Sequence, residues 1–400
     1  MNDANLFGPE MLADPYPIYD RLRLTDPVHW HAPSAAWVVT RYDDVLAGLH
    51  DPRLSSDRSA ALRELAGDPD LRPFFDFVSD KMNFTDPPRH TRLRGLVNKA
   101  FTPHAVEALA PAIERRIAEL LNAVRGKGAM DVITDFAYPL PGTVICQALG
   151  LPVEDLPRLK RWSDDFLLFF GNAPAGVTAE GYRRAAASVR EQTAYFRALL
   201  PQLRGGPESC LLRALELAEE EGDRLSEPEL YATAQSLVLA GHETTTGLIG
   251  DGLLALLRHP EQLRRLRDDP ALIPQAVEEL LRYVCPVQFV LRQAREDLEI
   301  AGRAVRKGQF VLLVLAAANR DPAHFPVPEA LDITREANKH LSFGQGGHAC
   351  PGMALARLET RLAFEGLLSR LPALRLGPGP LEYQPSFSPR CLRSLPVSFA

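Results

Sequence analysis

Cysteine is scarce in this chain, and other features that would mark a particular class of protein are missing with it. There are five cysteines in 400 residues, an odd number at wide spacing, which excludes a disulfide-built secreted scaffold. The longest apolar run, residues 311–318, is far shorter than the ~18 residues of a membrane span. A net charge of −6 provides no basic surplus for nucleic acid, so we expect no nucleic-acid partner.

Segments that would divide the chain are also absent. No Ser/Gly-rich linker, low-complexity tract or internal repeat interrupts it, so we expect a single domain over residues 1–400. That length is sufficient to bury a core and a cofactor. The first residues, Met-Asn-Asp-Ala, contain neither a basic nor an apolar targeting segment. We therefore expect a cytoplasmic protein with no secretory signal and no membrane anchor.

The hydrophobic pattern predicts a mainly helical fold with a small β lobe, which is an α+β class. Period-2 segments place the β lobe at about 25–45 and 290–315, and a C-terminal β pair at about 383–399. Helices are expected over residues 90–100, 105–124, 136–149, 155–169, 179–200, 208–220, 226–257, 264–267 and 273–283. Ser226 and Glu229 form a capping-box pattern at the start of the longest helix. The apolar middle of that helix predicts that it is central and buried.

The most informative motif is a glycine-rich loop that contains one cysteine, Phe343-Gly-Gln-Gly-Gly-His-Ala-Cys350-Pro-Gly. The glycines let the backbone approach a flat, bulky group and turn N–H groups inward. A helix begins at about Gly352, and its N-terminus also stabilises an anion. A thiolate is a metal ligand, but a single one makes neither a zinc site nor an iron–sulfur site. It does fit the one axial ligand of a haem.

A second motif, Ala240-Gly241-His242-Glu243-Thr244-Thr245, lies in the middle of the long helix. Gly and Thr are poor helix formers, and a Thr hydroxyl can bond the carbonyl four residues earlier. We expect the helix to open locally here and leave room for a diatomic ligand and water. A buried Glu is costly without partners, so Glu243 is expected to have a function.

Two further groups of charged residues have helical spacing. Glu279 and Arg282 are three residues apart, and His90 and Arg94 are four apart, so each pair shares one helix face. Taken alone, such spacing usually marks an exposed pair of little energetic weight.

Together these motifs resemble those of the cytochrome P-450 family. The loop from Phe343 to Gly352 fills every fixed position of the family's haem-ligand pattern, Phe-Gly-x-Gly-x-His-x-Cys-x-Gly, and Ala-Gly-x-Glu-Thr matches its oxygen-activation motif. The likeness runs from about Asp14 to the C-terminus, and the missing anchor is typical of bacterial members. It implies the cytochrome P-450 fold, with a long central helix over a buried haem b (iron protoporphyrin IX) whose axial thiolate comes from Cys350.

The resemblance also implies roles for individual residues. Thr244 would hydrogen-bond dioxygen, and Glu243 would supply protons through water to break the O–O bond; His242 matches no role and is interpreted as structural. Glu279 and Arg282, with Arg335, would form a buried network that braces the cysteine loop. His90, Arg94, Arg292 and His348 would hold the two haem propionates by charge-assisted hydrogen bonds. The implied cofactor-binding residues are His90, Arg94, Ala240, Gly241, Arg292, Phe343, Gly344, His348, Cys350 and Gly352.

The implied activity is oxygen activation followed by hydroxylation or epoxidation of a hydrophobic small molecule such as a terpenoid, steroid, fatty acid or polyketide. By family position the pocket residues are Phe84, Val238, Leu239, Ala240, Val287, Phe289, Val290 and Leu392. They are all apolar, and such residues are more often ordinary core. Residues 55–82 and 166–181 are expected to form a lid.

The chain has neither a flavin domain nor an iron–sulfur motif, so the resemblance implies electrons from a separate ferredoxin and its NAD(P)H-dependent reductase. Cations that could steer the ferredoxin, if they are not simply solvated charges, are Arg89, Arg92, Lys99 and Arg357. Two alternatives remain open, namely a haem-thiolate enzyme that uses peroxide or that couples or rearranges substrates, and a non-catalytic haem-binding sensor.

Pro351 departs from the family pattern, because many relatives have a residue with an N–H after the ligand cysteine. Proline cannot donate a hydrogen bond. We hypothesise one fewer N–H···S bond to Cys350 and therefore a lower haem reduction potential.

Overall fold

The computed structural model describes residues 6–204, 210–220, 222–336, 338–371 and 373–399. Its principal helices are α1 (Pro9–Ala13), α2 (Tyr16–Thr25), α3 (Tyr42–His50), α4 (Ser59–Ala66), α5 (Arg72–Ser79), α6 (Arg89–Ala100), α7 (Pro103–Glu107), α8 (Ala110–Arg125), α9 (Pro139–Leu149), α10 (Leu156–Phe170), α11 (Ala179–Leu203), α12 (Leu211–Leu217), α13 (Glu227–Arg258), α14 (Pro260–Asp268), α15 (Ile273–Val284), α16 (Leu315–Ala318) and α17 (Met353–Arg370). None of these described helices combines the length and apolar character that crossing a membrane requires.

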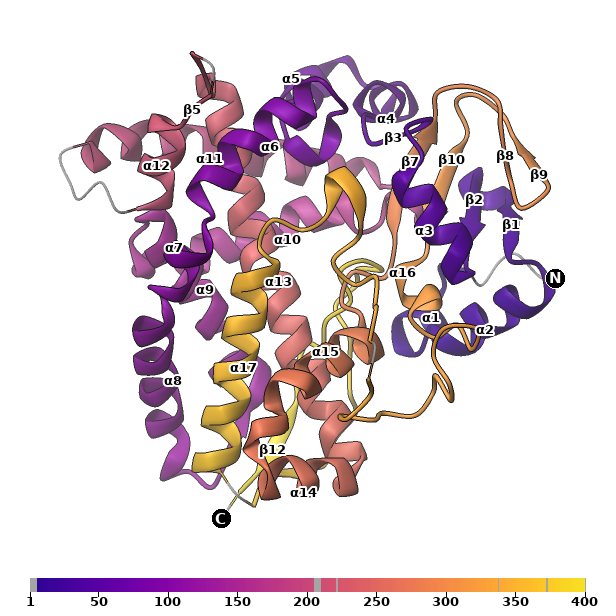
Figure 1. The fold of residues 1–400 in the computed structure, drawn as a ribbon. Helices are drawn as coiled ribbons and strands as arrows, with labels where there is room; N and C mark the ends of the chain where they lie inside the picture. Colours follow the sequence, from indigo (N-terminus) through magenta and orange to yellow (C-terminus); the bar gives the residue numbers. More distant parts are fainter. Residues whose placement is uncertain (1–5, 205–209, 221, 337, 372, 400) are drawn as a thin grey trace.

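The β structure lies mostly on one side of the molecule (Figure 1). A five-stranded sheet has the order β1 (Val28–His31), β2 (Ala36–Val39), β10 (Phe310–Leu313), β7 (Val290–Ala294) and β3 (Leu54–Ser55). β10 runs parallel to β2 and antiparallel to β7. A three-stranded sheet, β11 (Arg375–Leu376), β12 (Pro396–Ser398) and β4 (Ala129–Asp131), and two hairpins, β5 (Glu219–Glu220) with β6 (Asp223–Arg224) and β8 (Leu298–Ile300) with β9 (Arg303–Val305), complete it.

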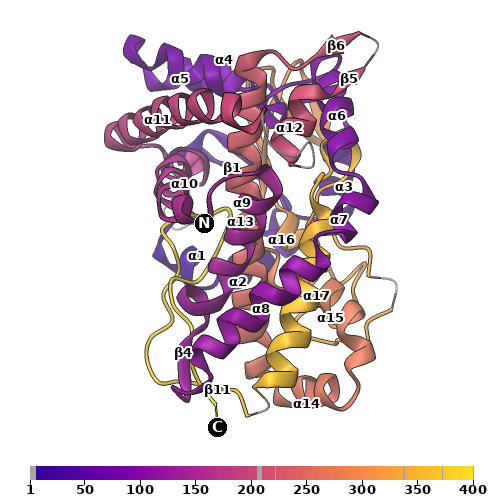
Figure 2. The same ribbon diagram turned by 90° about the vertical axis from the view of Figure 1, so that its left-hand side faces the viewer.

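Helix α13 is the centre of the helical part, and both ribbon views show it running through the molecule (Figures 1 and 2). Its first turn is closed by the Ser226–Glu229 capping box that the sequence predicts. Because most of its side chains are apolar, it is buried on nearly all sides against α9, α15 and α17. The cysteine loop lies at the beginning of α17, which packs beside α13. The fold therefore brings the two principal motifs to neighbouring helices.

Several predicted elements differ in detail. The helix expected over 105–124 is two helices, α7 and α8, because Pro111 cannot donate a backbone hydrogen bond and fits only a first turn. The helix expected over 136–149 begins with a π-helical turn, Ile133–Ala137, before Pro139. The helix expected over 208–220 spans Leu211–Leu217, followed by β5; residues 208–209 lie outside the described chain.

The C-terminal β pair that we expect within residues 383–399 is reduced to a single bridge, and the strand in this segment pairs with other strands. Tyr383 and Leu392 form an isolated antiparallel bridge, while β12 pairs with β4 and β11 instead. Pro385 and Pro389 lie between the bridged residues and have no N–H for a ladder. The β lobe near residues 25–45 and 290–315 is confirmed by β1, β2 and β7 to β10.

Candidate active site

The cysteine loop is folded by its own backbone. The N–H of Cys350 donates to the Phe343 carbonyl at 2.8 Å, and the N–H of Gly344 donates to the Leu341 carbonyl at 2.8 Å. Gly344 and Gly346 have φ values of 66° and 71°, a left-handed conformation that strains other residues. At Gly346 a Cβ would also lie 3.2 Å from the Leu49 carbonyl. The loop therefore requires glycine at these two positions.

The Cys350 thiol lies where several groups act on its ionisation. Burial raises its pKa, while the Gly352 N–H, which bonds the sulfur, and the charges of Arg94 and Arg357 act to lower it. Gly352 is also the N-cap of α17, so the helix N-terminus faces the thiol. Elsewhere in the described ranges, no three His, Cys, Asp or Glu side chains converge as a metal site would require. Burial has the larger effect and the pKa stays raised, so the loop presents a single thiol, which would bind a metal as the thiolate.

A cavity with an empty volume of about 1170 Å³, including its opening to solvent, separates the cysteine loop from α13. Ala240, Gly241 and Thr244 line it from α13, and the facing wall carries the predicted cofactor residues Phe343, Gly344, His348, Cys350 and Gly352. Arg292, Val287 and Val290 reach it from β7 and the segment before it. The structure therefore brings both motifs to the lining of one cavity.

The α13 motif is built differently from the predicted opening. The Thr244 hydroxyl donates to the Ala240 carbonyl at 2.8 Å, as expected for a back-bonded Thr. However, α13 is uninterrupted from Glu227 to Arg258, so the expected local break is wrong. At Gly241 a Cβ would lie 2.9 Å from Ile145. Glycine is needed there to let α9 approach α13.

Glu243 faces away from this cavity. It lines a separate pocket with Asp164, Arg184 and residues of the C-terminal segment. One carboxylate oxygen, Oε1, lies 3.0 Å from His242 Nε2 and 3.3 Å from Lys160 Nζ. Burial raises the pKa of Glu243, but His242 and Lys160 outweigh it and lower the pKa to about 2. His242, interpreted as structural from the sequence, is thus the neighbour of this carboxylate.

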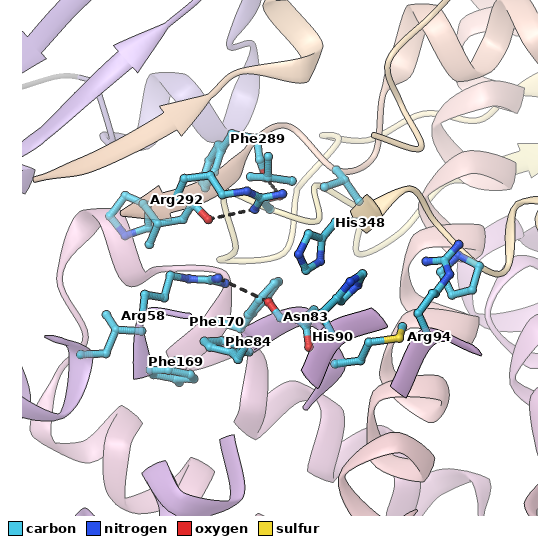
Figure 3. Close-up of a pocket in the computed structure, with 18 residues that line it drawn as sticks. Arg58, Asn83, Phe84, His90, Arg94, Phe169, Phe170, Phe289, Arg292 and His348 are labelled. Carbon is cyan, nitrogen blue, oxygen red and sulfur yellow. Dashed lines mark hydrogen bonds between the residues drawn. The ribbon is translucent and has the colours of Figure 1, made fainter. Parts of the chain in front are cut away.

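Basic groups gather at the edge of the cavity, in an adjoining pocket that we call the outer pocket (Figure 3). His90, Arg94, Arg292 and His348 all line it. The His90 and His348 rings are 3.8 Å apart between centroids, and His90 Nε2 is buried without a partner in the described chain. Burial, His90 and Arg292 lower the pKa of His348 to about 3.

These groups fit the propionates of a haem. Neither Arg94 nor Arg292 has a carboxylate within ion-pair distance among the described residues; Arg94 Nη1 donates to the Ala349 carbonyl and Arg292 Nη1 to the Leu291 carbonyl. Arg292 is buried and Arg94 is partly buried, with its Nε bonded to the Asn98 side chain; guanidinium groups removed from water in this way favour anionic partners. Two arginines and an unpartnered histidine nitrogen beside a cavity with one thiol match a flat cofactor that carries two carboxylates.

The predicted support network is present and larger than expected. Arg282 donates to both oxygens of Glu279, at 2.7 and 2.8 Å, and both side chains are fully buried. Arg335 donates to the same carboxylate at 3.1 Å. Arg282 also donates to the Asn319 carbonyl at 3.0 Å, and the Asn319 side chain bonds Ser342, just before the loop. A continuous hydrogen-bonded path therefore connects the network to the cysteine loop.

The predicted substrate residues divide into two groups. Phe84, Val287, Phe289 and Val290 line the adjoining pocket, which has an empty volume of about 880 Å³. Val238, Leu239 and Leu392 line neither of these two cavities, and Val238 and Leu392 are buried in the core. Both predicted lid segments, 55–82 and 166–181, contribute to this pocket, the first through Arg58, Leu62 and Met82 and the second through Phe169, Phe170 and Pro174.

Three residues at or near these cavities were not predicted. Arg58 lines the outer pocket and is buried. Lys160 pairs with Glu243 across the α10–α13 contact. Glu359 lines the cavity beneath Cys350, where burial raises its pKa. None has a local motif: Arg58 follows an ordinary Ser-Ser-Asp turn, and the environments of Lys160 and Glu359 depend on long-range packing.

Comparisons with known proteins agree with this site. Residues 202–373 match the family model described as Cytochrome P450. Cytochrome P450 CYP107DY1 of Priestia megaterium is 42% identical, with 98% of each chain covered. The solved structure of P450BioI in complex with hexadec-9Z-enoic acid ligated acyl carrier protein aligns with a TM-score of 0.91, 38% identity, and coverage of 98% of this chain and 99% of that one.

A second structure, myxobacterial CYP267B1 in complex with myristic acid, aligns with a TM-score of 0.88 and 40% identity, covering 99% of this chain and 98% of that one. The chain belongs to the cytochrome P450 family. It is a P450 monooxygenase whose haem has a cysteine thiolate ligand, and it has the family's fold.

Proposed function

We propose that this monooxygenase hydroxylates or epoxidises a hydrophobic small molecule, with electrons from a separate ferredoxin and its NAD(P)H-dependent reductase. The observation that carries the proposal is that Cys350 and Thr244, from two separate motifs, line the same cavity. That cavity takes residues from Leu49 to Glu359, which supports a single catalytic domain. When bound, the haem supplies oxygen activation, and the protein supplies the ligand, the orientation and the protons.

The residues of the chain then have distinct tasks. Cys350 would hold the haem iron through its thiolate. His90, Arg94, Arg292 and His348 would hold the propionates at the cavity edge. The Thr244 hydroxyl would donate a hydrogen bond to dioxygen. Glu243, whose carboxylate lies in the separate pocket beside Asp164 and Arg184, would turn toward the cavity to supply protons through water. The Glu279 network keeps the cysteine loop in position.

Among hydrophobic substrates, we favour a fatty acid or another long-chain acid over a terpenoid, steroid or polyketide. The outer pocket is lined by aromatic and aliphatic side chains, including Phe84, Phe169, Phe170 and Leu62. Two similar proteins of known structure contain fatty acyl groups, one as hexadec-9Z-enoic acid on a carrier protein and one as myristic acid.

We propose that the ferredoxin docks on the face that carries the cysteine loop. The four candidate steering cations are already engaged within the chain. Arg357 pairs with Glu278 at 2.7 Å, Arg89 with Asp80 at 2.5 Å and Arg92 with Glu229. The fourth, Lys99, donates to the Glu219 carbonyl. These pairs leave each cation partly exposed, so they order the side chains while the positive charge still reaches an acidic partner.

The spectrum of the dithionite-reduced protein under carbon monoxide is the first test. We expect the long-wavelength Soret band of thiolate-bound ferrous haem. Cys350→His should move the band to the shorter, imidazole-type wavelength. Cys210→Ser is the matched control, because Cys210 is also partly exposed but lies in neither cavity. An unchanged band in Cys350→His would contradict the assignment of the ligand.

The second test distinguishes oxygen activation from the alternatives. With a surrogate ferredoxin system, we expect Thr244→Ala to consume NAD(P)H with less product formed per cofactor oxidised. Thr233→Ala is the control, since Thr233 is buried on the same helix away from the cavity. Product formation from peroxide alone would favour the peroxide-using enzyme. NAD(P)H consumption that does not depend on Thr244 and yields no product would favour the haem-binding sensor.

A further inference from the structure

Arg58 is a buried cation in the pocket through which a substrate would reach the cavity. Its side chain is 5% exposed and lies just before α4, in one of the two lid segments. The guanidinium carbon lies 4.1 Å from the centre of the Phe84 ring. In Figure 3 Arg58 and Arg292 extend from different sides of the pocket in the same general direction, toward His348. The aromatic ring covers one face of the guanidinium and leaves its edge to the pocket.

No described side chain neutralises this charge. Arg58 Nη1 donates to the carbonyls of Ser56, at 2.7 Å, and Asn83, which are neutral acceptors. Its Nε and Nη2 make no hydrogen bond to any described residue, and neither is among the buried atoms without partners. These two donors therefore face open space, in the fork geometry that binds a carboxylate through two parallel bonds.

The nearest carboxylates are engaged elsewhere. Asp86 accepts from the Ser55 hydroxyl and the Ser56 N–H, and pairs with Arg295 at 2.6 Å. Asp57 accepts from the Ser59 hydroxyl at 2.9 Å. Burial and the nearby Arg292 lower the pKa of Arg58 to about 9, and the charges of Asp57 and Asp86, which act to raise it, offset them only in part. A buried guanidinium in this state gains most from an anion that enters from the pocket.

The haem propionates already have other partners. His90, Arg94, Arg292 and His348 cluster where the outer pocket meets the haem cavity, and both arginines and His348 are close to Cys350 or line its cavity. Arg58 lines only the outer pocket, together with Leu62, Phe169 and Phe170. Its position is therefore that of a group that meets the substrate on its way to the haem.

We propose that Arg58 recognises a carboxylate of the substrate, so that the enzyme selects long-chain carboxylic acids over neutral compounds of the same chain length. This inference rests on the proposed function and specifies its substrate class. The aliphatic and aromatic lining takes the chain, and Val287 and Val290, which border both cavities, guide it toward Thr244. A carboxylate bound at Arg58 thus places the carbons far from the carboxyl end of the substrate near the haem.

The test compares binding of three probes to the ferric holoenzyme, measured as the low-spin to high-spin change in the Soret band. The probes are dodecanoate, methyl dodecanoate and dodecanol. Because a hydrogen-bonded charge pair is worth more than a neutral bond, we expect dodecanoate to bind ~10-fold or more tightly than the two neutral probes. Arg58→Gln should remove that preference and leave dodecanol affinity within about 3-fold, since the apolar lining is intact.

Two variants control for indirect effects. Arg58→Lys keeps the charge without the fork and should retain only part of the preference. Arg53→Gln removes an exposed arginine five residues before Arg58 that pairs with Asp51, and should behave as the wild type. Equal affinity of the wild type for all three probes would overturn the proposal.

The anion could also be a haem propionate, and the same variants distinguish that source. If Arg58 binds the cofactor, Arg58→Gln lowers haem retention and weakens all three probes equally, which also overturns the proposal. A different result is expected if the proposed function itself is wrong. The protein would then show no thiolate-type carbon monoxide band and would not oxidise dodecanol. Turnover of dodecanol with no preference for dodecanoate would leave the monooxygenase assignment standing and refute the role of Arg58.

Discussion

Lys160 Nζ lies 3.3 Å from Glu243 Oε1, joining α10 to the oxygen-activation motif of α13. Lys160 also bonds Asp164, one turn further along α10. The carboxylate of Glu243 is almost fully buried, and without cations its ionised form would be unfavourable in that position. The α10–α13 contact therefore keeps this carboxylate ionised, and the segment after α10 that we expect to form a lid is connected to that charge through the same helix.

Replacing Lys160 by Met should lower stability, and most strongly near neutral pH. The pKa of Glu243 is lowered to about 2 from an ordinary value of 4.5, so its contribution is fully present above pH ~4.5 and is lost as pH falls toward 2. Without Lys160 that pKa rises, so the carboxyl of the variant takes up a proton at higher pH and then no longer needs the cation. We expect thermal unfolding at pH 7 to show a loss of about 1–3 kcal/mol, and this loss should shrink as pH falls toward 2. The exposed Lys127→Met is the control; equal loss in both variants would contradict the role of the ion pair.

A second buried lysine should act in the opposite direction. Lys81 is 1% exposed, with Nζ 3.1 Å from the Ser236 hydroxyl and 4.6 Å from the centre of the Phe166 ring. Burial lowers its pKa to about 7 from 10.5. The unfolded chain therefore binds more protons between pH 7 and 10.5, and stability rises with pH across that window.

We expect Lys81→Met to stabilise the protein at pH 7 by about 1–3 kcal/mol, because the desolvated charge is removed and the apolar contacts remain. The gain should shrink as pH rises toward 10.5, because the native wild-type lysine is then neutral and no desolvated charge remains to be removed. Thermal unfolding of both proteins at pH 7 and 9.5 measures this difference. Destabilisation at pH 7 would mean that the Ser236 contact outweighs the cost of burial.

The Glu279–Arg282 pair should contribute far more to the stability of the fold than its helical spacing alone indicates. Both side chains are fully buried, so Glu279→Gln leaves Arg282 without its anion and should cost about 3–5 kcal/mol. Glu365→Gln is the matched control, because it removes the acid from an exposed Glu–Arg pair on α17 and should cost at most about 0.5 kcal/mol. Haem retention during thermal unfolding reports whether the cysteine loop loosens at the same time.

Local spacing was sufficient to predict part of this site. The cysteine loop and the Ala240–Thr245 motif are continuous in sequence, so their backbone geometry brings their own residues together. Helical spacing also explains an error. Val238 was assigned to the pocket, but on α13 it shares a face with His242, whose Nδ1 contacts the Val238 carbonyl at 2.6 Å, and lies opposite Ala240 and Thr244. Periodicity alone could have placed Val238 in the core.

Other features depend on contacts that spacing does not contain. The Glu279–Arg282 pair was predicted from its helix, but Asn338, which donates to the same carboxylate at 3.0 Å, comes from a distant loop. Arg58 and Lys160 have unremarkable neighbours in sequence, and their importance arises from Phe84 and Glu243, which only the fold brings to them. The absence of a carboxylate beside Arg58 is likewise a property of the packed pocket.

The final prediction concerns the residue after the ligand. The Gly352 N–H bonds the Cys350 sulfur, whereas Pro351, between them, has no N–H to donate. A second donor stabilises the more anionic, reduced state by about 0.5–1.5 kcal/mol, or ~20–60 mV for one electron. We therefore expect Pro351→Leu to raise the midpoint potential of the haem in a redox titration. Pro351→Ala adds the same N–H with little added volume, although Pro351 also lines both cavities. A rise in Pro351→Leu alone would attribute the effect to side-chain volume, and no rise in either variant would show that the N–H does not reach the sulfur.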